Sequence, residues 1–272
     1  MLEFLEKHQP DAVCLQETKV APDKFPHLEL RAAGYRAIDY SGGQWAGVAI
    51  LVRDGVAVGD DIVQGLPGEP PTGDARWVEA TIEGVRLASV YVINGRTLDD
   101  PMFAHKLTFL EAMEQHLATL RGTPYVVCGD FNIAPGDLDV WDPAHFVGGT
   151  HVTPEERALL ERLLAAGSVD AYRHLEPEGV HYTWWDYRQG HFHRGLGMRI
   201  DLALVSEDLA PGLVHCGIDR DFRKGPKPSD HAPLLIEIDR GEERLPTDVT
   251  TARPGESRTE DGADSNESEA AS

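Results

Sequence analysis

The stretch "PYVVCGDFN", residues 124–132, predicts a buried strand that ends in polar side chains. Its apolar run at 125–128 suits a covered sheet, and Gly129 lets the backbone bend or be approached closely. Asp130 and Asn132 follow at the tip of the strand. Both residue types are common in turns. The stretch alone therefore allows either an ordinary turn or a functional site.

Composition places the chain among globular proteins. It has 272 residues, of which 41% are hydrophobic and 26% charged, enough for one large domain or two small ones. No apolar run approaches the roughly 18 residues that span a bilayer, and the first ten residues lack the apolar core of a signal peptide. Cys14, Cys128 and Cys216 are too few and scattered for a disulfide framework or a zinc site. We expect a reduced, cytoplasmic protein without a membrane partner.

The charge is large and unevenly distributed. A formal net charge of −21 normally argues against nucleic acid as a partner. Residues 241–272 hold nine acids and three arginines and no aromatic residue, which predicts a disordered tail. Basic residues gather instead in 187–199 and 219–228. We expect a folded domain over 1–239 and an acidic, disordered tail over 240–272.

Strands outnumber helices in the predicted structure. Expected helices span 2–8, where Pro10 ends the helix, 101–120 with one apolar stripe, and 154–166 with a capping box at Thr153–Glu156. A hairpin is expected to turn at Glu83–Gly84. The expected strands are 11–17, 47–52, 76–83, 85–92, 124–130, 181–185, 199–206 and 232–238. This pattern favours an α/β or α+β fold with sheets packed on each other.

Four acids share a position at the boundary of an expected strand: Glu17, Asp130, Asp201 and Asp230. Two follow a strand and two precede one, so antiparallel neighbours can bring all four to one rim. His231 and Asn132 join them there. Taken singly, each has an ordinary explanation: a surface acid for Glu17, a turn for Asp130 and Asn132, a cap for Asp230 and His231, and a pair with Arg199 for Asp201.

The shared position favours a site. Converging carboxylates repel one another unless a cation neutralises them. Oxygen ligands suit Mg²⁺, with Mn²⁺ as the alternative, and these ions keep waters for a phosphate substrate. An aspartate beside a histidine orients the imidazole for acid–base work or phosphate contact. Together these features imply metal-assisted attack of water on a phosphoester.

The motifs also resemble a known family. They are "LQETK" (15–19), "YVVCGDFNIAP" (125–135), "TWWDYR" (183–188), "GLGMRIDLALVS" (195–206) and "KPSDHAPLLIEI" (227–238). Their order and spacing resemble the exonuclease III family of AP endonucleases, within the endonuclease/exonuclease/phosphatase superfamily. The resemblance covers residues 1–239. It implies a four-layer sandwich of two mixed β-sheets packed face to face, with helices outside.

The resemblance also implies residue roles. It implies that Glu17 binds the metal with support from Asp230, and that Asp130 orients or deprotonates the attacking water. It also implies that Asn132, Tyr91 and His231 contact the phosphate. Asp201 would support His231. Lys19 is expected beside the site. Trp184 matches the aromatic residue that lines the pocket for a flipped-out abasic sugar, with a core tryptophan as the alternative. The expected DNA phosphate contacts are Arg188, Arg194, Arg199, Arg223, Lys224 and Lys227, with a solvated face as the alternative.

Two departures from the family stand out. Ile93 replaces the usual proline two residues after Tyr91. The family's first strand, which ends in an Asn-x-Asn-Gly type motif, is missing, because Met1 falls inside the first expected helix. We favour a recorded start that lies downstream of the true one. The alternative is a truly short chain that is either a weakened enzyme or a non-catalytic binding protein.

The sequence thus predicts a Mg²⁺-dependent DNA repair nuclease that acts as a monomer on double-stranded DNA. It would cut 5′ to abasic sites and digest duplex DNA from 3′ ends. One alternative is a phosphoesterase of the same superfamily with a non-DNA substrate. The other is a DNA-binding protein without catalysis, because the first strand is absent.

Overall fold

A six-stranded sheet forms the centre of the folded unit. The computed structural model describes residues 1–42 and 45–241, and Met1–Arg240 form one compact unit. The sheet has the order β4-β5-β6-β7-β9-β8, with β6 and β7 parallel and the other neighbours antiparallel. Its strands are β4 Val63–Gln64, β5 Trp77–Ile82, β6 Val85–Tyr91, β7 Tyr125–Asp130, β8 Ser168–Asp170 and β9 Asp201–Ser206.

Two smaller sheets complete the described strands. One has the order β1-β3-β2, and the other pairs β10 with β11; both are antiparallel. Their strands are β1 Ala12–Gln16, β2 Tyr35–Tyr40, β3 Val48–Arg53, β10 Leu213–Ile218 and β11 Leu234–Ile238. β3 packs its apolar side chains, such as Val48 and Ile50, against Val78 and Ala80 of β5. The expected α/β class with packed sheets is therefore confirmed.

The second layer differs from the single mixed sheet that the resemblance implies. Within the described ranges, β1 is hydrogen-bonded only to β3 and β11 only to β10. Because β1 and β11 do not pair with each other, the layer consists of two separate antiparallel sheets. The side chains of β1 are half-buried, whereas five of the six in β3 are buried.

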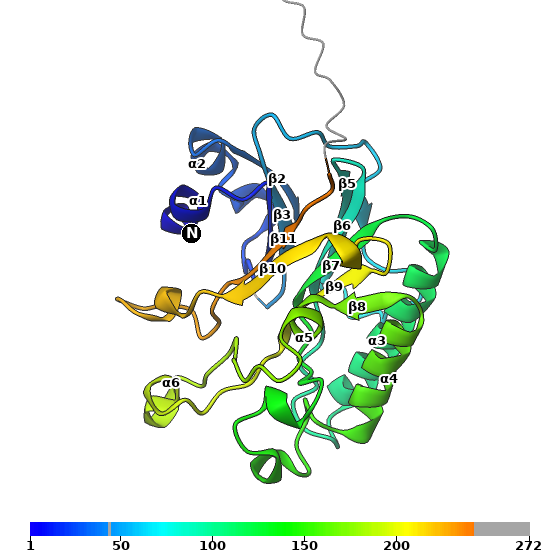
Figure 1. Cartoon of the computed structure of the whole chain (residues 1–272), viewed down its shortest axis with the longest axis vertical. Helices are drawn as coiled ribbons and strands as arrows, with labels where there is room; N and C mark the ends of the chain where they lie inside the picture. Colours follow the sequence, from blue (N-terminus) through cyan, green and yellow to red (C-terminus); the bar gives the residue numbers. More distant parts are fainter. Residues whose placement is uncertain (43–44, 242–272) are drawn as a thin grey trace, which may run out of the picture. The chain divides into compact units, whose positions relative to one another are not determined.

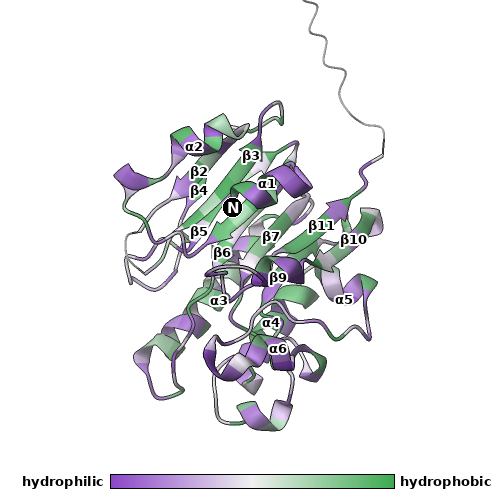
Figure 2. Ribbon diagram, turned by 90° about the vertical axis from the view of Figure 1, so that its left-hand side faces the viewer, coloured by the Kyte–Doolittle hydropathy of each residue, from purple (hydrophilic) through white to green (hydrophobic). Residues whose placement is uncertain are grey.

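Helices cover the outside of the sheets (Figure 1). They are α1 Leu2–His8, α2 His27–Ala32, α3 Pro101–Thr119, α4 Pro154–Ala165, α5 Ala171–Leu175 and α6 His191–Arg194. Short 3-10 segments span Pro22–Lys24, Asp137–Asp139, Pro143–Phe146, Arg188–Gly190, Ala210–Gly212 and Arg220–Arg223. The helices α3 and α4 lie side by side, and Leu110 and Met113 of α3 join Leu163 of α4 in the largest apolar cluster. Figure 2 shows the hydrophobic colouring concentrated in the strands.

Most expected elements occur within two residues of their expected ends. The capping box at Thr153 and Glu156 is present, and the β5–β6 hairpin turns at Glu83 and Gly84, both with positive φ. The strand expected at 181–185 is wrong, because only isolated bridges from Trp184 form there. The strands β2, β4, β8 and β10 were not expected.

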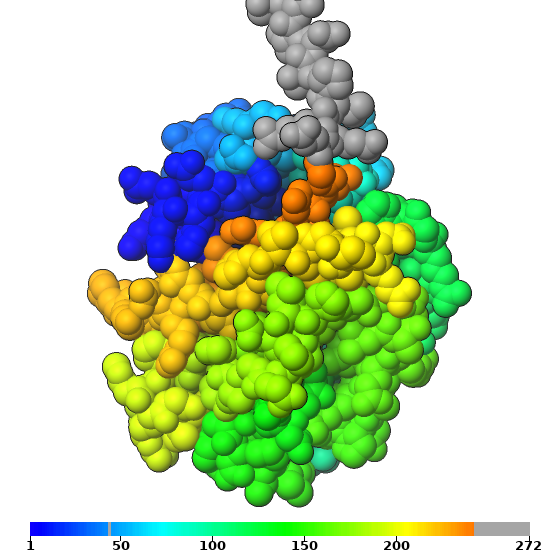
Figure 3. Space-filling model, viewed as in Figure 1, coloured from blue at the N-terminus to red at the C-terminus, as the bar shows by residue number. Residues whose placement is uncertain are grey.

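The first helix packs against a segment far along the chain. Lys7 and His8 contact the Asp219 carboxylate, with nitrogen–oxygen distances of 2.5 and 2.9 Å, and the Phe4 and Phe222 rings meet edge to face. In the space-filling view the N-terminal residues lie beside the last part of the folded unit (Figure 3). These contacts fix the start of β1, which leads to Glu17. Across residues 1–42 and 45–241, no helix combines the length and apolar character needed to cross a bilayer.

Candidate active site

Three neighbouring strands bring polar side chains to one edge of the six-stranded sheet. Asp130 is the last residue of β7 and is 4% exposed. It lies opposite Tyr91, the last residue of the parallel strand β6, and opposite Asp201, the first residue of the antiparallel strand β9. The sheet topology thus juxtaposes residues that the sequence separates widely. The expected meeting of Asp130 and Asp201 at one rim is confirmed.

Gly129 permits this arrangement. Its φ is +153°, and a Cβ there would lie 1.9 Å from the Val90 carbonyl oxygen. Any side chain would therefore push β6 and β7 apart. Beyond it, Asn132 has a left-handed φ of 52° and folds back on Asp130. The Asn132 amide N–H donates to Asp130 Oδ1 at 2.8 Å, and Asn132 Nδ2 donates to Asp130 Oδ2 at 3.1 Å.

His231 lies between two of the carboxylates. Its Nδ1 is 2.7 Å from Asp201 Oδ2, and its Nε2 is 4.0 Å from Asp130 Oδ2. Burial lowers the pKa of His231, but the charges of Asp201, Asp130 and Asp230 outweigh burial and raise it to about 10. At neutral pH the ring is an imidazolium. The alternative pairing of Asp201 with Arg199 is wrong.

The Asp130 carboxyl is poised to exchange a proton. Burial raises its pKa most, Asp201 and Glu17 raise it further, and the imidazolium of His231 lowers it, which leaves a pKa of about 7. A carboxyl with such a pKa can act as a general base near neutral pH. The combination of desolvation and a specific charged partner in one group is typical of functional sites.

Glu17 and Tyr91 form the next part of the rim. The Tyr91 hydroxyl donates a short hydrogen bond to Glu17 Oε1, and Lys19 Nζ lies 2.5 Å from Glu17 Oε2. Burial raises the pKa of Glu17, but its contacts with Lys19 and Tyr91 outweigh burial and lower it. Burial and the Glu17 carboxylate both raise the pKa of Tyr91. Glu17 is therefore ionised and Tyr91 protonated at neutral pH.

Trp184 and Asp230 lie on the other flank of His231. Trp184 Nε1 donates to Asp230 Oδ2 at 3.1 Å, and the Trp184 backbone bridges to both Met198 and His231. The half-buried indole packs on a small apolar cluster that includes Met198 and Ile200. An apolar wall therefore adjoins the carboxylates.

The donor set fits a hard cation. In the described part of the chain, no three His, Cys, Asp or Glu side chains are arranged to hold a metal ion by themselves. Mg²⁺ commonly uses one or two protein carboxylates and completes its shell with water and substrate phosphate. The ionised Glu17 carboxylate supplies that kind of donor, and Asp230, next to His231 in the chain, would add a second one. The site thus suits Mg²⁺ better than zinc, which prefers nitrogen and sulfur ligands.

Sequence analysis missed the residues that hold Asn132. Asn94 Nδ2 and His151 Nε2 each lie 3.0 Å from Asn132 Oδ1. Lys106 Nζ donates to the Asn132 carbonyl oxygen at 2.6 Å and forms an ion pair with Glu156, and both charged side chains are fully buried. One signal was available: Lys106 interrupts the apolar face of α3.

The predicted DNA contacts divide into exposed and buried residues. Arg188, Arg194, Lys224 and Lys227 are exposed. Arg199 is fully buried, with its guanidinium 2.7 Å from Asp139 and 2.8 Å from Asp170. The expected DNA contact of Arg199 is wrong, because this ion-pair network encloses the side chain.

Arg223 is also only 6% exposed. It donates to the backbone carbonyls of Ser229 and Trp185. Its expected position on an open DNA-binding face is therefore wrong as well. On the open face, the exposed basic residues are the ones that a DNA backbone can contact.

The chain is similar in sequence and in structure to known proteins. A profile of the Endonuclease/Exonuclease/phosphatase family matches residues 1–231. Exodeoxyribonuclease III of Haemophilus influenzae is 34% identical over 86% of this chain and 92% of its own length. A structure of the 3′ phosphatase NExo from Neisseria, bound to a product DNA hairpin, is 37% identical, with a TM-score of 0.84 over 87% of this chain and 92% of that one.

An AP endonuclease structure is also similar. The enzyme from Archaeoglobus fulgidus is 34% identical, with a TM-score of 0.82 over 88% of this chain and 93% of that one. The chain belongs to the exonuclease III family within the Endonuclease/Exonuclease/phosphatase family. It is a hydrolytic DNA repair nuclease, and members of its family generally depend on a divalent metal.

Proposed function

We propose that the chain is a Mg²⁺-dependent nuclease that hydrolyses the phosphodiester 5′ to abasic sites and removes nucleotides from the 3′ ends of duplex DNA. The observation that carries the proposal is the environment of Asp130. Its carboxyl has a pKa of about 7 and lies against Asn132, Asp201 and the imidazolium of His231. This set offers a base and fixed positive charge beside one another.

Each residue of the proposed active site has its own role in phosphodiester hydrolysis. Asp130 orients the attacking water and accepts its proton. Asn132, Tyr91 and the His231 imidazolium contact the scissile phosphate, and Asp201 holds the His231 ring in place. Glu17, with Asp230, would hold Mg²⁺, which supplies charge neutralisation for the phosphate when it is bound.

DNA recognition uses the exposed surface around this centre. The chain acts as a monomer in this proposal. Trp184 is the aromatic wall for an extruded abasic sugar, which leaves the duplex at little cost because it has no base pair to break. Arg188, Lys224 and Lys227 contact backbone phosphates. Because these contacts displace counterions from DNA, the affinity should fall steeply with salt, and the acidic net charge should keep non-specific affinity weak.

A second candidate activity is removal of a 3′ phosphate. It is favoured by the similarity to NExo, whose structure is described as that of a 3′ phosphatase. The same base and phosphate contacts serve a 3′-terminal monoester, because the attacked group is again a phosphate ester.

The test compares three duplex oligonucleotides under one set of conditions. One carries an internal stable abasic analogue, one a recessed 3′ hydroxyl and one a 3′ phosphate. Incision 5′ to the analogue and shortening of the 3′ end, both lost with EDTA and in Asp130→Ala, are the expected results. Release of phosphate alone would leave only the second candidate. No reaction on any DNA would overturn the proposal.

A further inference from the structure

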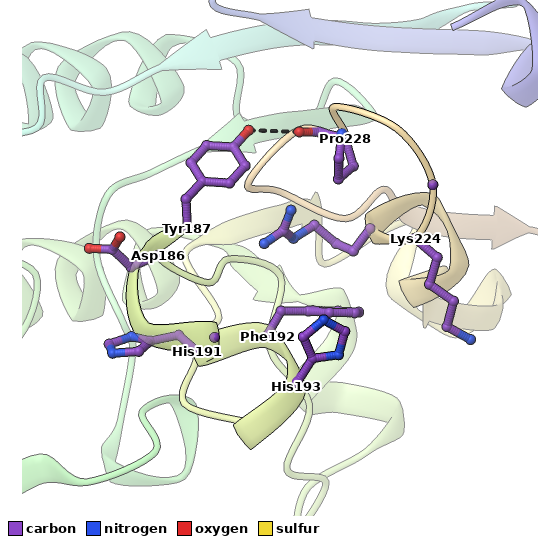
Figure 4. A pocket seen from close by; sticks show the side chains of 10 residues that line it. Asp186, Tyr187, His191, Phe192, His193, Lys224 and Pro228 are labelled. Carbon is purple, nitrogen blue, oxygen red and sulfur yellow. Dashed lines mark hydrogen bonds between the residues drawn. The ribbon is translucent and has the colours of Figure 1, made fainter.

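A cavity beside the proposed active site has no role in the chemistry described above. It has a volume of about 360 Å³ and lies between the segments 186–193 and 223–228. Figure 4 shows Tyr187 on one side of it and Phe192 with His193 on the other. The Tyr187 hydroxyl donates to the Pro228 carbonyl at 2.7 Å and so ties the two segments together.

A buried arginine lines this cavity without a counter-charge. The Arg223 guanidinium lies 5.3 Å from the centroid of the Tyr187 ring and 5.0 Å from that of Phe192. Among the described residues, no carboxylate lies within ion-pair distance of Arg223. Its two terminal nitrogens donate to the backbone carbonyls of Ser229 and Trp185, and its buried Nε has no hydrogen-bond partner. A desolvated, unpaired charge is costly unless an anion joins it.

The mouth of the cavity adds exposed positive and aromatic groups. Lys224 is exposed and lies at the wall, where its ammonium reaches the equally exposed Asp221 at 2.6 Å. Tyr187 is 62% exposed, which is unusual for a large ring. The one acid in the lining, Asp186, already accepts from the Arg188 backbone N–H and Nε. The lining thus combines aromatic faces with an unmatched positive charge.

We infer that this cavity is a nucleotide subsite, in which a base stacks on the aromatic lining and its phosphate pairs with Arg223 and Lys224. Aromatic rings bind every base through its face, and the Nε–H of Arg223, unlike its two terminal nitrogens, is free to donate to a phosphate oxygen. The inference rests on the proposed function for its source of nucleotides. Pro228 lies two residues before Asp230, and Tyr187 three after Trp184, so the cavity is built on the same two segments as these site residues.

The test measures binding without cleavage. The full chain is titrated in EDTA with 2′-deoxyadenosine 5′-monophosphate and, separately, with inorganic phosphate. The mononucleotide is expected to bind more tightly than phosphate. Phe192→Leu, which keeps an apolar side chain but removes the ring, should weaken mononucleotide binding about tenfold, the order expected for losing one stacked base.

Two further variants test the charged part of the lining without changing the buried Arg223, whose loss could disturb folding. Lys224→Ala should weaken both the mononucleotide and phosphate. Lys24→Ala, which removes another exposed lysine near an aspartate, should change neither. Equal affinity for mononucleotide and phosphate, or no effect of Phe192→Leu and Lys224→Ala, would overturn the inference.

The source of the nucleotide is distinguished by competition. If the subsite holds an unpaired DNA strand, a duplex with unpaired 3′ nucleotides displaces the mononucleotide and a blunt duplex does not. If it holds the released product, neither duplex displaces it; both outcomes support a nucleotide subsite. Because these titrations contain no metal, failure of the subsite is separate from failure of the proposed nuclease activity, which is measured on the same preparation.

Discussion

Lys106 Nζ donates to the backbone carbonyl of Asn132 at 2.6 Å from inside the protein, where its charge is paired with Glu156. The same ammonium also reaches the Asn94 carbonyl and the Thr150 hydroxyl. One buried cation therefore joins the segments that follow β6 and β7 to the start of α4. Its position links the packing of the fold to the geometry of the proposed site.

Lys106→Met should lower both stability and rate. Removing one member of a buried ion pair leaves Glu156 unpaired, which typically costs about 3–5 kcal/mol of unfolding free energy. A shift of Asn132 by an ångström would reduce kcat on the order of 10²-fold. Denaturant unfolding and single-turnover cleavage measure the two effects.

The double variant Lys106→Met/Glu156→Met separates these effects. Because it removes both charges, it should recover most of the lost stability. It should not recover kcat, since Asn132 still lacks its donor. Recovery of full activity in the double variant would show that Lys106 serves folding alone.

Asp201→Asn should impair catalysis while the fold survives. Loss of the carboxylate lowers the pKa of His231 from about 10, because Asp201 is the largest factor that raises it. With a neutral ring and a changed hydrogen bond, kcat should fall about 10²- to 10⁴-fold. An NMR titration of His231 and steady-state kinetics test this, with Asp208→Asn on the exposed loop after β9 as control. An unchanged His231 pKa would contradict the account.

The pH profile of kcat/KM should be bell-shaped. Asp130 must be ionised to accept a proton, so activity rises with pH up to its pKa of about 7, and bound Mg²⁺ moves that limb to lower pH. His231 must be protonated, so activity falls as pH passes its pKa of about 10. Full activity down to about pH 4, the ordinary range of an aspartate, would be inconsistent with a raised Asp130 pKa.

Arg199 and Lys227 should behave differently on DNA. Lys227→Ala removes an exposed cation and should reduce the slope of log K against log salt by about 1. Arg199→Gln removes the charge and the forked contacts with Asp139 and Asp170, so it should lower stability, but it should leave the slope unchanged because the buried guanidinium contacts no phosphate. Equilibrium DNA binding across a salt series, with thermal unfolding of each protein, measures both. A reduced slope for Arg199→Gln would show that this residue contacts DNA after all.

The sequence revealed the parts of the site that local patterns mark. Asp130 is visible because a carboxylate interrupts an apolar strand next to a glycine, and the Thr153–Glu156 cap is visible because its spacing is fixed. Arg199 was misassigned because its partners Asp139 and Asp170 lie 60 and 29 residues away, and a local cluster of basic residues does not show which of them turns inward.

The remaining site residues depend on tertiary contacts. His151 meets Asn132 across 19 residues, and Lys106 meets Glu156 across 50. Neither pair has a fixed spacing that a pattern could detect. The aromatic residues of 181–185 favour a strand, yet Trp185 is buried without a ladder partner.

The most direct test of the central claim is cleavage of a duplex that carries one stable abasic analogue, with Mg²⁺ and with EDTA, by the unaltered chain and by its Asp130→Ala variant. The account predicts incision 5′ to the analogue by the unaltered chain with Mg²⁺ and no product in the other reactions. Incision that persists in Asp130→Ala would contradict the assignment of Asp130 as the base. A folded, DNA-binding chain that cuts no DNA substrate would contradict the nuclease site itself.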